Sequence, residues 1–183
     1  MRLYQDGKRL VIAEGKTQVW VEPWGKNSLR VRMTALPVMA AEDWALTEPV
    51  EETESQISFE TVDVTDPWYR GDEFVKYHQT GVQASLVNGK ITAKVSCEGW
   101  ISFWNQKGEL LTQEYWRNRN RINRYCVPLR IDARELKPVQ GCDDFELTAR
   151  FEAFDGEKIF GMGQYQEKHL DKKGASLELA HRN

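Results

Sequence analysis

Two tryptophans near the middle of the chain have the type and spacing to bind a ligand. Trp100 and Trp104 flank Ser102 at intervals of two residues, so in a strand all three side chains lie on one face. Indole rings on a sheet face can stack on sugar rings, as in carbohydrate-binding modules, although aromatic side chains more often pack in cores and interfaces. Trp100 and Trp104 are therefore a possible sugar platform, and ordinary packing is the alternative.

Other reactive residue types lack the spacing of a catalytic or metal site. His78, His169 and His181 are far apart and have no carboxylate partner at a fixed distance, so neither a zinc site nor a Ser-His-Asp arrangement is indicated. The run Gly161-Met162-Gly163-Gln164 lacks the third glycine of a dinucleotide-binding loop, because position 166 is Gln166. The sequence predicts no catalytic residue, no metal site and no cofactor in this chain.

Composition and charge exclude a general affinity for polyanions. The chain has 183 residues, of which 40% are hydrophobic and 29% charged, and its formal net charge is −3. This balance gives no electrostatic reason to bind nucleic acid or anionic membranes. The arginines of residues 117–124 form one basic cluster, for which a solvated hairpin tip or a contact with another domain or subunit is expected.

The cysteines and the amino terminus predict a cytoplasmic protein. The chain has an odd number of cysteines, Cys97, Cys126 and Cys142, and their spacing is not that of a metal site. This indicates reduced thiols that are mainly structural. The first residues contain no apolar segment of a secretory signal. No stretch approaches the roughly 18 apolar residues that cross a bilayer, so no membrane partner is expected.

Apolar and polar residues alternate with a period of two along much of the chain. The apolar members of three such runs are Leu29, Val31 and Met33; Ile91, Ala93 and Val95; and Phe145, Leu147, Ala149 and Phe151. This period predicts half-buried antiparallel strands, with the apolar members facing a core. It also supplies the strands that would carry the two tryptophans.

Turn signals separate the predicted strands. Asn88-Gly89 lies between residues 82–87 and 90–95 and is typical of a tight hairpin, whereas residues 24–27 and 105–108 suit longer turns. Many short strands with few or no helices predict an all-β fold, an antiparallel β-sandwich or barrel. The acidic residues 40–60 are expected to form a solvated loop or insertion, and residues 34–80 a variable, loop-rich region.

Several segments form an ordered series of motifs. They are Val21-Glu22-Pro23-Trp24-Gly25, Asn88-Gly89-Lys90-Ile91, Gly99-Trp100-Ile101-Ser102-Phe103, Gly108-Glu109-Leu110-Leu111, Glu157-Lys158-Ile159-Phe160-Gly161-Met162-Gly163-Gln164 and Ala180-His181-Arg182-Asn183. In this order and spacing they resemble glycoside hydrolase family 31, the α-glucosidases and α-xylosidases. The resemblance is firmest over residues 17–33 and 88–183, and it departs from the family pattern at Met162, where leucine is usual.

The resemblance implies how the chain is organised. It implies that residues 1–183 are a single amino-terminal β-sandwich domain, a galactose mutarotase-like supersandwich, with residues 161–164 in a strand. A catalytic (β/α)8 barrel would follow, carrying two aspartates about 5 Å apart for a retaining mechanism. A barrel needs about 250 residues, so this chain alone is expected to be inactive and cut off before the barrel. Its implied partners are that barrel and an α-glycoside substrate.

The resemblance also implies that the end of the chain borders the substrate site. Arg182 and Asn183 stand where a loop of the amino-terminal domain reaches the active-site mouth, and a frayed chain end is the alternative. Two other functions remain open for the domain, a free-standing carbohydrate-binding module and a structural sandwich that assembles with a partner, so an oligomer is possible.

Overall fold

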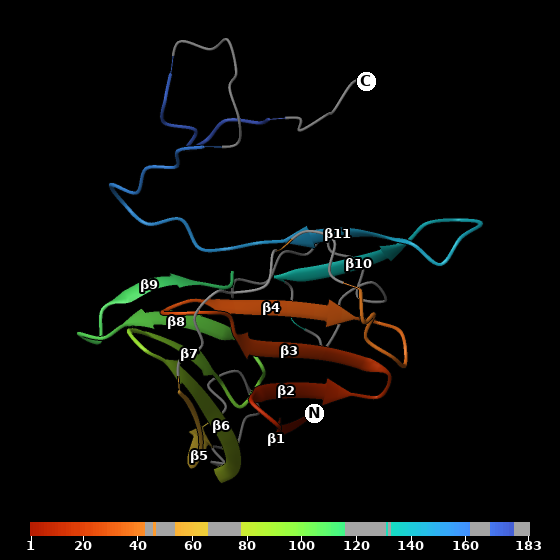
Figure 1. The fold of residues 1–183 in the computed structure, drawn as a ribbon, viewed down its shortest axis with the longest axis vertical. Coiled ribbons are helices and arrows are strands. Elements are labelled where there is room, and N and C mark those ends of the chain that lie inside the picture. The colour runs from red at the N-terminus through yellow and green to blue at the C-terminus, as the bar shows by residue number, and fades with distance from the viewer. Residues whose placement is uncertain are drawn as a thin grey trace, which may run out of the picture. The chain divides into compact units, whose positions relative to one another are not determined.

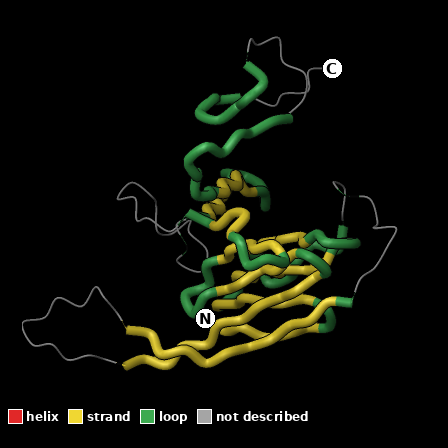
Figure 2. The backbone as a smooth tube through the Cα atoms, turned by 90° about the vertical axis from the view of Figure 1, so that its left-hand side faces the viewer, coloured by secondary structure: helices red, strands yellow, loops and turns green. Residues whose placement is uncertain are grey.

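The structure, a computed structural model, describes residues 1–42, 46, 54–65, 78–115, 131, 133–161 and 169–177. The chain divides into two compact units, Met1–Glu152 and Ala153–Asn183. The described residues contain eleven strands. Figure 2 shows strands in yellow and no helix in red. In these residues no helix is long and apolar enough to cross a membrane.

The first sheet contains four antiparallel strands in chain order (Figure 1). They are β1 (Arg2–Asp6), β2 (Arg9–Glu14), β3 (Thr17–Pro23) and β4 (Leu29–Thr34). In β4, Leu29 and Met33 pack against the core as predicted, but Val31, which was also expected to be buried, is 42% exposed. The arginines on either side of Val31 are instead half-buried, because both donate to the Glu22 carboxylate.

The second sheet contains five antiparallel strands, again in chain order. They are β5 (Ser55–Thr65), β6 (His78–Asn88), β7 (Ile91–Val95), β8 (Ile101–Asn105) and β9 (Leu110–Gln113). Gly89 has φ +60°, so the tight hairpin between β6 and β7 is confirmed. The expectation of an irregular segment over residues 40–60 is wrong from Ser55 onward, because β5 pairs along its whole length with β6.

The two sheets enclose one apolar core, and the predicted all-β antiparallel sandwich is confirmed. The core side chains are Leu10, Ile12, Val19 and Val21 from the first sheet, Ala84, Leu86, Ala93, Val95 and Ile101 from the second, and Ile131 and Ala133. Burying a side chain such as Leu86, which has no exposed area, contributes about 2 kcal/mol. β1 and β2 lie beside β6, where the sheets meet.

A hydrogen-bonded clamp joins the turns of the two sheets. The Asn88 side chain is fully buried and its Nδ2 donates to the carbonyls of Gly25, at 2.8 Å, and Ser28, at 2.7 Å. In the other direction, the amide of Lys90 donates to Asn27 Oδ1 at 2.7 Å. This Asn88 clamp connects the β6–β7 hairpin to the β3–β4 turn and fixes one end of the sandwich.

A third, two-stranded sheet is amphipathic and exposes its apolar face. It consists of β10 (Arg134–Pro138) and β11 (Phe145–Ala149). The alternation of residues 145–151 agrees with the prediction, but the expected burial is wrong, since Leu147 is 62% exposed and Phe151 51% exposed. At its Arg134 end this face is covered, because Arg134 is 4% exposed and bound to Glu114 and to the Gly99 carbonyl, whereas Leu147 and Phe151 are left open. The opposite face pairs its charges, Lys137 with Glu146 at 2.9 Å and Arg150 with Glu135 at 2.7 Å.

The second unit, Ala153–Asn183, contains turns and no strand in its described part. The Asp171 carboxylate accepts the amides of Ile159, at 2.9 Å, and Lys173, at 3.0 Å. The pKa of Asp171 is held below its usual range by these hydrogen bonds. The bond from the Ile159 amide has the larger effect, and that from the Lys173 amide the next. The strand implied for residues 161–164 is absent at Gly161, and positions 162–168 lie outside the described residues.

Candidate functional site

A groove of about 500 Å³ lies on the outer face of the second sheet. Every strand of that sheet contributes to its lining. The polar side chains of these strands that line it are Ser58 and Glu60 from β5, Gln83 and Ser85 from β6, Lys94 from β7, Ser102 from β8 and Gln113 from β9; Ser96, Trp100 and Glu114 line it from beside the strands. Because one groove draws on five adjacent strands, the face must be hollowed rather than flat.

The strand period explains why these side chains point into the groove. Ala84 and Leu86 face the core, so Gln83 and Ser85, the alternating residues of β6, face outward. The hollow follows from sheet twist, which Figure 1 shows as a progressive change of strand direction from β9 to β5. An irregularity in the β8–β9 pairing beside Trp104 adds to it, since bulges increase local twist.

Cross-strand hydrogen bonds hold the floor of the groove in place. Gln83 Nε2 donates to the Glu60 carboxylate at 2.7 Å, and the hydroxyls of Ser58 and Ser85 lie 2.8 Å apart. Each pair joins residues that are directly opposite each other in the β5–β6 register. Hydroxyl, amide and carboxylate groups keep further donor and acceptor positions after one such bond, so these side chains remain able to bind a ligand.

The structure gives the two predicted platform tryptophans different surroundings. Trp100 lines the groove and also packs on the core. Trp104 is not among the lining residues: its indole N–H donates to Ser102 Oγ at 2.8 Å, and Lys94 Nζ lies 4.4 Å from its ring centroid. An ammonium group over the ring leaves less of the Trp104 face for a sugar.

A buried ion pair supports Trp100, and the sequence analysis did not single it out. Glu114 and Arg134 side chains are 8% and 4% exposed, with Arg134 Nη2 2.6 Å from Glu114 Oε2. Arg134 also donates to the Gly99 carbonyl at 2.9 Å, and Glu114 accepts the Ile101 amide at 2.8 Å. The pair therefore binds the backbone on both sides of Trp100. In the sequence this ion pair is visible only as two charged residues, Glu114 directly after β9 and Arg134 at the start of β10.

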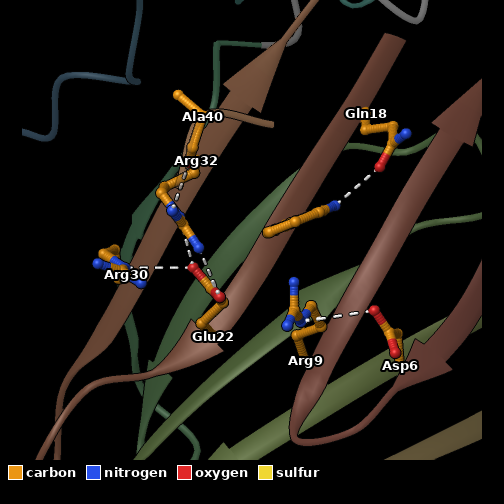
Figure 3. A network of polar contacts seen from close by, with 8 residues as sticks. Asp6, Arg9, Gln18, Glu22, Arg30, Arg32 and Ala40 are labelled. Atoms are coloured by element: carbon orange, nitrogen blue, oxygen red, sulfur yellow. Dashed lines mark hydrogen bonds and ion pairs between the residues drawn. The ribbon is translucent and has the colours of Figure 1, made fainter. Parts of the chain in front are cut away.

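A second polar network covers the outer face of the first sheet (Figure 3). Arg9 and Arg32 lie over the Trp20 ring, 4.2 and 5.1 Å from its centroid. Glu22 accepts hydrogen bonds from Arg32 Nε, at 2.8 Å, and Arg30 Nε, at 3.2 Å. Each arginine of this network has a carboxylate partner, Glu22 for Arg30 and Arg32 and Asp6 for Arg9, which suits a rigid outer surface better than a binding site.

Several predicted residues lie outside the described part of the chain. They include Arg182 and Asn183, the arginines of residues 117–124, Cys126 and His181. Within the described part, no three His, Cys, Asp or Glu side chains come together as a metal site. Cys97 and Cys142 are free thiols there, and burial raises the pKa of Cys97.

Known proteins that resemble this chain match it over most or all of its length. No family model matches the chain. The chain is 41% identical over 172 residues to an "uncharacterized family 31 glucosidase ORF2" of Pseudescherichia vulneris, a match that covers 89% of this chain and 28% of that protein.

A solved structure agrees with this match. It is the crystal structure of a GH31 α-xylosidase from a soil metagenome, complexed with xylose, which is 39% identical to this chain. The TM-score is 0.75, and the match covers 100% of this chain and 25% of that one. The chain thus spans about a quarter of the length of these relatives. The resemblance seen in the motif series is confirmed: the chain is homologous, in sequence and in fold, to part of the glycoside hydrolase family 31 proteins.

Proposed function

We propose that this chain is the non-catalytic, amino-terminal β-sandwich domain of a retaining α-glycoside hydrolase of family 31. The proposal includes the galactose mutarotase-like type of sandwich and an active site on a separate (β/α)8 barrel of the same protein. Partial coverage of both relatives, 28% and 25%, supports it.

The observation that carries the proposal is the exposed apolar face of the β10–β11 sheet. Leu147 and Phe151 are 62% and 51% exposed on the face that also bears Leu136. Covering one such side chain is worth about 1–2 kcal/mol, and contiguous apolar surface of this kind marks an interaction site. We assign the apolar side to the barrel.

The intact protein is proposed to hydrolyse α-glycosides, with α-xylosides and α-glucosides as the first substrates to test. These are the activities in the names of the two relatives. In this scheme the sandwich supports the barrel, and Arg182 and Asn183 border the active-site mouth. The proposed location is the cytoplasm.

Hydrolysis assays on two proteins test the proposal directly. We expect this chain to release no product from para-nitrophenyl α-xyloside or α-glucoside, because the reaction needs two carboxyls that the barrel would supply. The longer protein that contains this chain is expected to hydrolyse at least one of them. Hydrolysis by the chain alone, or by neither protein, would contradict the proposal.

Substitutions on the β10–β11 face test the packing. Leu147→Ser and Phe151→Ser are each expected to lower the thermal unfolding midpoint of the longer protein by several degrees, because each removes about 1–2 kcal/mol of apolar burial between domains. In this chain alone the same changes should leave the midpoint unchanged. Leu36→Ser is the matched control, since Leu36 is 42% exposed in the turn after β4. Equal effects of all three substitutions in the longer protein would refute docking at this face.

A further inference from the structure

We propose that the groove on the outer face of the second sheet is a saccharide-binding site of this chain. The proposal goes beyond the proposed function, because it concerns binding by the sandwich itself. It rests on the charge balance, the hydrogen-bonding groups, the aromatic wall and the dimensions of the groove.

The charges of the groove favour a neutral ligand. Glu60 and Lys94 contribute one charge of each sign, and the carboxylate of Glu114 is already bound to Arg134. An anion or a cation would therefore meet no net opposite charge. A neutral ligand would instead meet a mixed set of donors and acceptors.

The hydrogen-bonding groups favour a ligand rich in hydroxyls. Ser58 and Ser85 are hydroxyls in register with each other, and Gln83 and Glu60 form the next pair on the same face. A vicinal diol, which donates and accepts at neighbouring oxygens, can bond to both members of such a pair. The two pairs lie two residues apart along the strands, which is about 7 Å.

Trp100 supplies an apolar wall beside these polar groups. Its backbone is held on both sides by the Glu114–Arg134 ion pair, and its own amide donates to Ser96 Oγ at 3.2 Å. An aromatic side chain fixed before binding loses little conformational entropy when a ligand packs on it. The C–H face of a pyranose ring is the part of a sugar that such a wall accommodates.

The dimensions indicate an oligosaccharide. The volume of about 500 Å³ lies within the range of small-molecule sites. The lining residues extend from β5 to β9, four strand spacings, which corresponds to about 19 Å across the sheet. A groove of this length suits a chain of several sugar units better than a single one.

Titration of this chain with maltotriose and with xylotriose tests the proposal. Tryptophan fluorescence and backbone amide chemical shifts are followed as the saccharide is added. We expect saturable binding of at least one of them, with shifts confined to residues of the groove. Gln83→Ala and Ser85→Ala are each expected to weaken binding about fivefold, the effect of one lost hydrogen bond.

Gln56→Ala is the matched control, because Gln56 lies on β5, on the same face of the sheet, and does not line the groove. It should bind as the unaltered chain does. Trp100 itself is left intact, because it packs on the core and its loss would also affect folding. Absence of saturable binding to the folded chain, or binding unaffected by Gln83→Ala and Ser85→Ala, overturns the proposal. Hydrolysis is not measured here, so this proposal and the proposed function can fail independently.

Discussion

Glu114→Ala is expected to lower the free energy of unfolding of this chain by about 3–5 kcal/mol. The substitution leaves Arg134 as a buried guanidinium whose remaining partner among the described residues is the Gly99 carbonyl. It also removes the acceptor of the Ile101 amide. A buried charge without its counterion and a buried amide without its acceptor are both costly. Urea unfolding followed by tryptophan fluorescence measures the change.

The exposed ion pair between Lys137 and Glu146 provides the control. Its side chains are 61% and 66% exposed, so Lys137→Ala should change stability by less than about 0.5 kcal/mol. Replacing Glu114 and Arg134 together by leucine and methionine should recover much of the loss, since neither charge is then buried alone. A single Glu114→Ala effect as small as that of Lys137→Ala would show that the pair is not buried in solution.

Asn88→Ala is expected to cost about 2–3 kcal/mol of stability, because it leaves the Gly25 and Ser28 carbonyls without their common donor. Asn88→Asp is nearly the same size, yet it presents carboxylate oxygens to both carbonyls and should cost more than alanine. Equilibrium unfolding in urea ranks the two variants.

Gln5→Ala is the control for the Asn88 clamp. Gln5 Nε2 also donates to a turn carbonyl, that of Gly7 at 2.9 Å, but on the exposed surface. Its loss should stay within about 0.5 kcal/mol, because water replaces the donor. If Asn88→Asp proved as stable as the unaltered chain, the geometry of the clamp would have to be wrong.

Most of the sandwich could be predicted from the sequence, because the alternation of apolar residues in a strand and the residue types of a turn are both local properties. Asn88-Gly89 identified its hairpin from two residues alone. The buried role of the Asn88 side chain depends on a turn 60 or more residues away in sequence, which no local pattern contains. For the same reason the alternation of residues 145–151 indicated a strand with an apolar side, yet could not show whether another layer covers it.

The candidate site was found only in part from the sequence. The shared face of Trp100, Ser102 and Trp104 followed from the spacing of two, but the placement of Lys94 over the Trp104 ring depends on cross-strand register. Glu60 and Gln83 became site residues through a pairing of strands that are separated by 12 intervening residues. The spacing of polar residues on β6 was a usable signal, since Gln83 and Ser85 alternate with the core residues Ala84 and Leu86.

The strand order of the two main sheets has a consequence for folding kinetics. In both sheets each strand pairs with its neighbour in the sequence, so most pairing requires the closure of short loops. Hairpins of this kind form within microseconds, and the entropic cost of distant contacts falls on the docking of one sheet against the other. The Asn88 clamp spans this long-range step, since its partners are 63 and 60 positions apart in the sequence. It therefore belongs to the slow part of folding, in which two locally formed meanders become one sandwich.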